Sequence, residues 1–336
     1  MNIQAYAANE AKGDIAPFSY ESGELRHDDV LIEVENCGIC HSDLSMLNND
    51  WGNSMFPLVA GHEAIGKIVE KGAGVDHLQL GQRVGLGWFS GSCMHCSECM
   101  SGHHNRCGTA EQTVVGRHGG FGSHVVSKKE WAVPLPDSLD FAKAGPLFCG
   151  GLTVFNPFVQ NDISPMDRVG VIGIGGLGHL ALQFGNAWGC EVTAFSTSAD
   201  KEPEAREMGA HHFVSTGDAD ALAQIAGTLD MVLVTVNVGL DWGAYINTLK
   251  PGGKLHFVGA APPAEFTPFQ LIMGQRSITA TPVGSPVTAG RMIEFCARHE
   301  ISPVTEHFPM SNINDAFEHL KSGKARYRIV LDADFN

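Results

Sequence analysis

The sequence predicts an α/β protein with two domains, in which a mostly β-stranded part is followed by a doubly wound parallel sheet. Short runs rich in β-branched residues fill the first 145 residues, whereas strand-like and helical segments alternate between about residues 150 and 285. Such alternation is typical of a parallel sheet with helices on both faces. A chain of 336 residues is also long enough for two domains that each have a core.

The expected elements follow in chain order. β-like runs that end at glycines lie at 30–36, 64–72 and 83–89. The expected strands of the parallel sheet are 168–172, 190–195, 211–215, 230–235, 254–259 and 277–283, with helical stretches between most of them. The chain is expected to close with two helices and a strand, at 289–300, 312–320 and 327–333.

The composition predicts a soluble, cytoplasmic, globular protein with 43% hydrophobic residues. Residues 1–14 lack the layout of a signal peptide, and the longest apolar runs, such as 231–236, are too short to cross a bilayer. The formal net charge of −15 argues against nucleic acid or an anionic membrane as a partner. In a reducing compartment, nine cysteines indicate metal binding or catalysis rather than a disulfide framework.

One short loop holds four of these cysteines: Cys93, Cys96, Cys99 and Cys107. Four thiolates in so tight a run predict a structural zinc site, because structural zinc is tetrahedral and is often bound by cysteine alone. An iron–sulfur cluster is the alternative. A bacterial ferredoxin run, however, has a closer fourth cysteine followed by proline, whereas Gly108 follows Cys107. His95, His103 and His104 in the same loop are expected to be solvated.

A glycine motif joins a strand-like run to a helix-compatible run, with Gly173, Gly175 and Gly178 spaced as G-x-G-x-x-G. In this context the motif predicts a dinucleotide site, where glycines let the backbone turn tightly and approach a pyrophosphate at a helix N-terminus. Gly176 and Leu177 lie within the same loop and are expected to take part.

The residue at the end of the second strand of this sheet distinguishes NAD from NADP. An acidic residue there would bind the ribose 2′-hydroxyl of NAD, but the sequence has Ser196. Ser196 and Thr197 offer hydroxyl groups and Lys201 offers a positive charge, which suits a 2′-phosphate. We therefore expect NADP(H) as the cofactor.

Cys37 and Cys40 form a Cys-x-x-Cys pair in the stretch "NCGICHSDL". By spacing alone, the pair could be a redox dithiol, half of a zinc site, or one ligand beside a bystander. His62, Glu63 and Cys149 are spread along the chain, and each alone could be an ordinary core residue.

Together these features resemble the zinc-dependent medium-chain alcohol dehydrogenases, and within them the cinnamyl alcohol dehydrogenase branch of NADP-dependent aldehyde reductases. The resemblance covers nearly the whole chain and rests on residues 37–44, 50–72, 93–107, 173–189, 196–198 with Lys201, and 325–332. It implies a GroES-like catalytic domain with both zinc sites, an inserted Rossmann NADP-binding domain, and an active site in the cleft between them. The expected bounds are 1–149 with 286–336 for the first domain and 150–285 for the second. Family members are commonly dimers or tetramers, and the strand at 277–284 is the candidate dimer edge.

By position, Cys40, His62 and Cys149 resemble the three protein ligands of a catalytic zinc, which leaves one position open for water or substrate. Glu63 matches a carboxylate that enters the zinc shell in some states. Asp43 matches a carboxylate that orients the ligand histidine. The resemblance also implies that Cys37 is not a ligand, and that zinc polarises the aldehyde oxygen.

The resemblance implies hydride transfer between NADP(H) and a primary alcohol/aldehyde pair, mainly as reduction of aromatic and aliphatic aldehydes. Ser42 matches the residue that passes a proton to or from the substrate oxygen. Many relatives end this relay at a histidine five residues after the first zinc cysteine, but this chain has Ser45, which is no base near neutral pH. The relay is then expected to end in water or at His41, a position that more often faces the cofactor phosphates.

Trp51 and Trp88 match residues that line the substrate pocket, with core packing as the alternative for Trp51. Arg328 resembles an arginine that reaches the cofactor pyrophosphate, with a solvated strand residue as the alternative. A zinc-free quinone reductase of the same fold would lack Cys40, His62, Cys149 and the four-cysteine loop. This chain has all seven residues. A zinc-binding NADP redox sensor with little activity remains the alternative function. It predicts reversible loss of zinc on mild oxidation.

Overall fold

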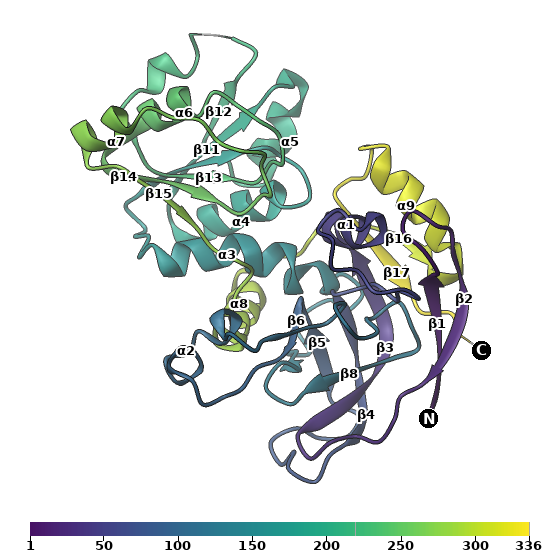
Figure 1. Ribbon diagram of the computed structural model, residues 1–336. Coiled ribbons are helices and arrows are strands. Elements are labelled where there is room, and N and C mark those ends of the chain that lie inside the picture. The colour runs from purple at the N-terminus through teal and green to yellow at the C-terminus, as the bar shows by residue number, and fades with distance from the viewer. Residues whose placement is uncertain (219, 336) are drawn as a thin grey trace. The chain divides into compact units, whose positions relative to one another are not determined.

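The computed structural model describes residues 1–218 and 220–335 (Figure 1). The chain divides into two compact units, the first formed by Met1–Leu152 and Gly284–Asn336 and the second by Thr153–Val283. Both ends of the chain therefore belong to one unit. Within the described ranges, no helix has the length and apolar character needed to cross a membrane.

The main sheet of the first unit has the strand order β16-β17-β3-β4-β5-β9, and β8 also pairs with β3. Two small sheets, β1-β2 and β6-β7, accompany it. The strands of this unit are β1 Asn2–Ala8, β2 Ile15–Glu21, β3 Asp29–Ile39, β4 Ala64–Lys71, β5 Arg83–Leu86, β6 Phe89–Gly91, β7 Glu111–Gln112, β8 His124–Lys128, β9 Val133–Pro134, β16 Thr305–Pro309 and β17 Arg328–Asp332.

Strand β3 is the centre of this unit, and almost all of its residues are buried. Near its end, it pairs antiparallel with β4 on one side, where Cys37 lies opposite Ala64, and with β17 on the other, where Ile39 lies opposite Ile329. Figure 1 shows the yellow C-terminal strands beside the purple N-terminal ones. Because both pairings are antiparallel, the end of β3 lies next to the starts of β4 and β17.

Among the described residues, five α-helices begin in the first unit: α1 His41–Asn48, α2 Ser97–Met100, α3 Gly150–Gln160, α8 Pro286–His299 and α9 Ile313–Lys321. α3 continues into the second unit. α8 begins three residues before the expected helix at 289–300, because the hydroxyl of Ser285 accepts a hydrogen bond from the amide of Thr288 at 3.2 Å and Pro286 fits the first turn. α9 buries its apolar side, on which Phe317 packs edge-on against Phe121.

The second unit is a parallel sheet with the strand order β12-β11-β10-β13-β14-β15. Its strands are β10 Arg168–Ile172, β11 Glu191–Ser196, β12 His212–Ser215, β13 Leu229–Val234, β14 Leu249–Phe257 and β15 Ser277–Ala280. The predicted doubly wound sheet is thereby confirmed. The largest difference is β14, which was expected to begin at residue 254 and begins at Leu249, next to a register irregularity opposite β13.

Helices lie on both faces of this sheet, with α3 and α4 on one face and α6 on the other (Figure 1). The α-helices that begin in the second unit are α4 Gly178–Trp188, α5 Glu202–Glu207, α6 Trp242–Thr248 and α7 Pro268–Gly274. The short 3₁₀ helices of the chain are η1 His104–Arg106, η2 Gly145–Phe148, η3 Ala199–Lys201, η4 Ala223–Ile225 and η5 Met310–Asn312. The strand order reverses beside β10, which is where open α/β sheets bind ligands at the carboxyl ends of the strands.

Candidate active site and metal centres

A buried carboxylate, Asp43, organises the region after β3. One oxygen of Asp43 accepts a hydrogen bond from the amide of Cys40 at 2.9 Å, which caps the first turn of α1. The other oxygen accepts hydrogen bonds from the amide of Gly61 at 2.9 Å and from Nδ1 of His62 at 2.8 Å. Gly61 has a φ of +94°, which favours glycine. Asp43 therefore joins the start of α1 to the segment before β4.

Four side chains meet beside Asp43: Cys40, His62, Glu63 and Cys149. They come from the end of β3, the segment before β4, and the junction of η2 with α3. One ligand atom of each lies within 4.8 Å of the others. Nε2 of His62 and Oε2 of Glu63 are buried without a hydrogen-bond partner among the described residues. Two thiols, an imidazole nitrogen and a carboxylate oxygen are the atoms that zinc binds, so this set fits a zinc ion.

The electrostatics of this cluster also favour a cation. The Sγ atoms of Cys40 and Cys149 are 3.8 Å apart, and their hydrogen bond lowers the pKa of Cys40 well below its usual value. The same bond, together with burial, raises the pKa of Cys149. Two thiolates at this distance in a buried site repel each other, and a divalent cation between them removes that cost.

His62 is held in one orientation. Burial alone would lower the pKa of His62, but the charge and the hydrogen bond of Asp43 raise it well above its usual value. A metal ion at Nε2 would take the place of the proton there, while Nδ1 stays bonded to Asp43.

Glu63 and Arg328 form a buried ion pair between the segment before β4 and the first residue of β17. A guanidinium nitrogen of Arg328 donates to Oε1 of Glu63 and lies 3.5 Å from the carbonyl oxygen of Ile39. Burial alone would lower the pKa of Arg328, but the nearby charges, of which Glu63 contributes most, raise it. The alternative that Arg328 is a solvated strand residue is therefore wrong, because its side chain is 6% exposed.

Sequence reasoning missed this pairing. The two residues are 265 positions apart, and the pairing of β3 with both β4 and β17 brings them together. No local pattern in the sequence reports it.

The first turn of α1 holds the residues expected for proton transfer. The thiol of Cys40 lies 3.8 Å from the hydroxyl oxygen of Ser42, so Ser42 is next to the cluster of Cys40, His62, Glu63 and Cys149. Ser42 and Ser45 are half-buried, and His41 is exposed.

Two tryptophans lie next to the cluster. The ring of Trp88 packs edge-on against the ring of His62, with centroids 4.9 Å apart. Trp51 packs in turn against Trp88 at 5.7 Å and is 45% exposed. Trp51 is therefore not a buried core residue. The two tryptophan rings lie in a row next to His62, with Trp88 between His62 and Trp51.

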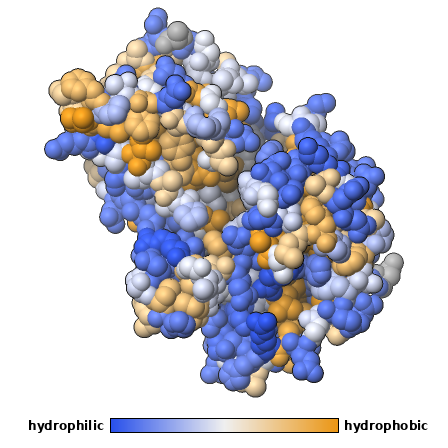
Figure 2. Space-filling view, in the orientation of Figure 1, coloured by the Kyte–Doolittle hydropathy of each residue, from blue (hydrophilic) through white to orange (hydrophobic). Residues whose placement is uncertain are grey.

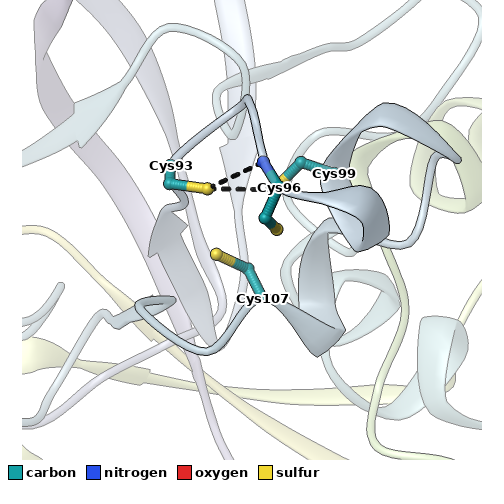
Figure 3. A group of neighbouring side chains, drawn as sticks. All are labelled: Cys93, Cys96, Cys99 and Cys107. Carbon is teal, nitrogen blue, oxygen red and sulfur yellow. Dashed lines mark hydrogen bonds between the residues drawn. The ribbon is translucent and has the colours of Figure 1, made fainter.

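A second cluster lies in the loop around α2, where one sulfur from each of four cysteines lies within 4.8 Å of the others (Figure 3): Cys93, Cys96, Cys99 and Cys107. The amide of Cys96 donates to Sγ of Cys93 at 3.3 Å. A hydrogen bond with Thr109 lowers the pKa of Cys107 to about 6, whereas burial raises the pKa of Cys99 to about 12. Four converging sulfurs fit tetrahedral zinc.

One expectation for this loop is wrong. His104 was expected to be solvated but is buried, because its ring packs edge-on against Trp131, whose ring centroid lies 6.5 Å away. His95 is exposed and His103 is half-buried.

The glycine loop of the second unit runs from the end of β10 into α4. Gly173 has a φ of +89°, and a Cβ on Gly178 would overlap the carbonyl oxygen of Gly173. Gly175 has open space around it, so a ligand can approach its backbone. Gly176 and Leu177 complete the turn, and Leu177 is the residue before α4.

The residues expected at the 2′-phosphate lie beside this loop. Ser196 ends β11, and its hydroxyl accepts a hydrogen bond from the amide of Ser198 at 3.1 Å. Nζ of Lys201 donates to the carbonyl oxygen of Ile174 at 3.1 Å, so its charge lies at the glycine loop. Thr197 is exposed. β11 thus ends in a serine, not in the acidic residue that would bind the ribose 2′-hydroxyl of NAD.

Two family models match this chain. The model of an alcohol dehydrogenase GroES-like domain matches residues 26–137, and the model of a zinc-binding dehydrogenase matches residues 176–298. The aldehyde reductase AdhA of Synechocystis sp. is 54% identical over 335 residues, which are 99% of this chain and 100% of that protein. The chain belongs to the zinc-binding alcohol dehydrogenase family. The family predicted from the sequence is thereby confirmed, and the protein is an oxidoreductase.

Solved structures of similar proteins have the same fold as this dehydrogenase. The cinnamyl alcohol dehydrogenase SbCAD4 of Sorghum bicolor is 35% identical, with a TM-score of 0.94, and the match covers 99% of this chain and 98% of that one. The Helicobacter pylori CAD complexed with NADP(H) is 28% identical, with a TM-score of 0.90, and the match again covers 99% and 98%.

The two cysteines of the Cys-x-x-Cys pair should differ in their effect on metal binding. Cys40 lies in the cluster with His62, Glu63 and Cys149, whereas the thiol of Cys37 is buried in β3, where burial raises its pKa. We expect Cys40→Ala to lose one equivalent of zinc and all activity, and Cys37→Ala to keep both. Elemental analysis of the purified variants, together with an activity assay, checks this. Equal loss in both variants would support a dithiol instead.

Proposed function

We propose that this dehydrogenase transfers a hydride between NADP(H) and a primary alcohol/aldehyde pair, mainly to reduce aromatic and aliphatic aldehydes. The buried cluster of Cys40, His62 and Cys149 supports this most directly, because His62 presents an unbonded Nε2 to two thiols. We assign residues 1–149 and 286–336 to the catalytic domain with both zinc sites, and residues 150–285 to the NADP-binding domain.

The catalytic zinc would be held by Cys40, His62 and Cys149, with Glu63 beside it and Asp43 holding the imidazole in place. When bound, zinc polarises the aldehyde oxygen and NADPH supplies the hydride. The structural zinc would be held by the four cysteines of the α2 loop: Cys93, Cys96, Cys99 and Cys107.

The cofactor would lie along the glycine loop of the second unit, where the backbone of Gly173, Gly175, Gly176, Leu177 and Gly178 cradles its pyrophosphate at the start of α4. The preference for NADP(H) is supported by Ser196 in place of an acid and by the charge of Lys201 at the loop. Thr197 would offer a second hydroxyl to the 2′-phosphate.

His41 and Arg328 are the two residues of the first unit that we assign to the cofactor phosphates. His41 is exposed at the start of α1. Arg328 would need to share its guanidinium between a phosphate and Glu63, with which it already pairs.

Trp51 and Trp88 would line the substrate pocket, since Trp88 packs against His62, Trp51 packs against Trp88, and both offer apolar ring surface to an aldehyde. We also propose a cytoplasmic homo-oligomer that binds neither nucleic acid nor membranes. Among the described residues, β15 is the last strand of its sheet and therefore forms an edge. Figure 2 shows apolar side chains over the nearby helix α7, where Phe269, Ile272 and Met273 are exposed.

An NADPH oxidation assay with a panel of aldehydes, before and after chelation, tests the proposed activity. We expect turnover with aromatic and aliphatic aldehydes, a lower KM for NADPH than for NADH, and loss of activity on removal of zinc. An equal or lower KM for NADH would contradict the cofactor assignment. Little activity together with reversible zinc release on mild oxidation would favour the redox sensor.

The proton step can be tested at Ser42, which we propose passes a proton through its Oγ to the substrate oxygen. Ser42→Ala should lower kcat by about 100-fold or more while zinc stays bound, because general acid–base steps contribute roughly 10²–10⁴-fold. Retained activity would remove Ser42 from the mechanism. Ser45→His is the companion variant. An unchanged pH–rate profile would show that position 45 is not part of the relay.

A further inference from the structure

One oxygen of the Glu63 carboxylate occupies space that a side chain at position 38 would fill. Oε1 of Glu63 accepts from Arg328, whereas Oε2 has no hydrogen-bond partner among the described residues. A Cβ built on Gly38 would overlap Oε2 and would lie 3.1 Å from both Cβ and Cδ of Glu63. The missing side chain at Gly38 therefore makes room for this carboxylate.

The backbone conformation of Gly38 does not require glycine. Gly38 lies inside β3, opposite Val330 of β17, and its amide donates to the carbonyl oxygen of Glu63 at 3.0 Å. It is not one of the glycines with a positive φ, unlike Gly61. An alanine would fit the strand conformation. The constraint at this position comes from the neighbouring carboxylate.

The surroundings of Glu63 limit where its carboxylate can go. The residue is fully buried, so a displaced carboxylate does not reach water. One of its oxygens already lies within 4.8 Å of the ligand atoms of Cys40, His62 and Cys149. A carboxylate oxygen binds zinc at about 2.0–2.2 Å, so a small movement makes it a ligand.

We propose that Gly38 is a positioning residue that keeps the Glu63 carboxylate on Arg328 and out of the open position of the metal centre. The inference rests on the proposed zinc chemistry. With a methyl group at position 38, Oε2 must leave its place, the pairing with Arg328 weakens, and the carboxylate competes with substrate for the metal. Gly38 thus determines how often the Glu63 carboxylate, in place of substrate, would occupy the fourth coordination position of the metal.

The test compares four proteins with cobalt in place of zinc: the unchanged chain, Gly38→Ala, Glu63→Ala, and the double variant. Visible absorption reports the ligands of cobalt, and the α2-loop site contributes equally to every protein. We expect Gly38→Ala to alter the spectrum and, in the zinc form, to lower kcat at least about tenfold, the scale of residues that act through a metal ligand. In the Glu63→Ala background the overlap with Oε2 is gone and only the 3.1 Å contact with Cβ of residue 63 remains, so both effects should become much smaller.

Gly120→Ala is a matched control. Gly120 is also buried and crowded, with Cβ of Ala64 and Sγ of Cys37 at 3.0 and 3.1 Å from a built Cβ, but Glu63 is not among its three nearest neighbours. It should leave the cobalt spectrum unchanged.

Three results would overturn the proposal: an unchanged spectrum in Gly38→Ala, an equal loss of activity in both backgrounds, or a double variant that also fails to fold. If only the single variant failed to fold and removal of the Glu63 carboxylate restored folding, the steric link would be supported. An inactive unchanged chain whose cobalt spectrum still responds to Gly38→Ala would contradict the proposed activity but not the role of Gly38.

Discussion

The carboxylate of Asp43 joins two of the three segments that build the cluster of Cys40, His62, Glu63 and Cys149. Its hydrogen bonds reach the amide of Cys40, the amide of Gly61 and the ring of His62, and the residue is fully buried. Hydrogen bonds to a charged group contribute about 1.5–3 kcal/mol each, and an unpaired buried charge costs more. Asp43 therefore fixes the direction of the His62 ring and the start of α1 at once. The rest of the site is arranged around that fixed imidazole.

Charge balance explains the other buried groups. With both cysteines deprotonated, as metal binding requires, two thiolates and the carboxylate of Glu63 place negative charge in a buried site, and Arg328 supplies one compensating positive charge from β17. Breaking a buried ion pair by removing one partner costs roughly 3–5 kcal/mol. A divalent cation offsets the remaining negative charge. Cys40, His62, Glu63 and Arg328 thus lie at or next to the adjoining ends of β3, β4 and β17, and Cys149 joins them from the junction of η2 with α3.

The sequence alone predicted the features that residues close together in the chain determine. The alternation of strands and helices predicted the parallel sheet, and 15 consecutive residues contain the whole four-cysteine cluster. Cys40 and Cys149 are 109 positions apart, so only the family resemblance grouped them. The pairing of Arg328 with Glu63 and the burial of His104 depend on strand register and tertiary packing, which no local pattern carries. The space that Gly38 leaves for Glu63 is a property of the packed structure for the same reason.

The zinc affinity of Asp43→Asn tests the central claim most directly, because this change removes the charge but keeps the size of the side chain. Competition with a chelator, monitored by elemental analysis, should show one zinc held as before and the other held about 10–100-fold more weakly. Asp50→Asn, an exposed position just after α1, is the matched control and should behave like the unchanged chain. Equal zinc affinity in Asp43→Asn and the unchanged chain would contradict the account.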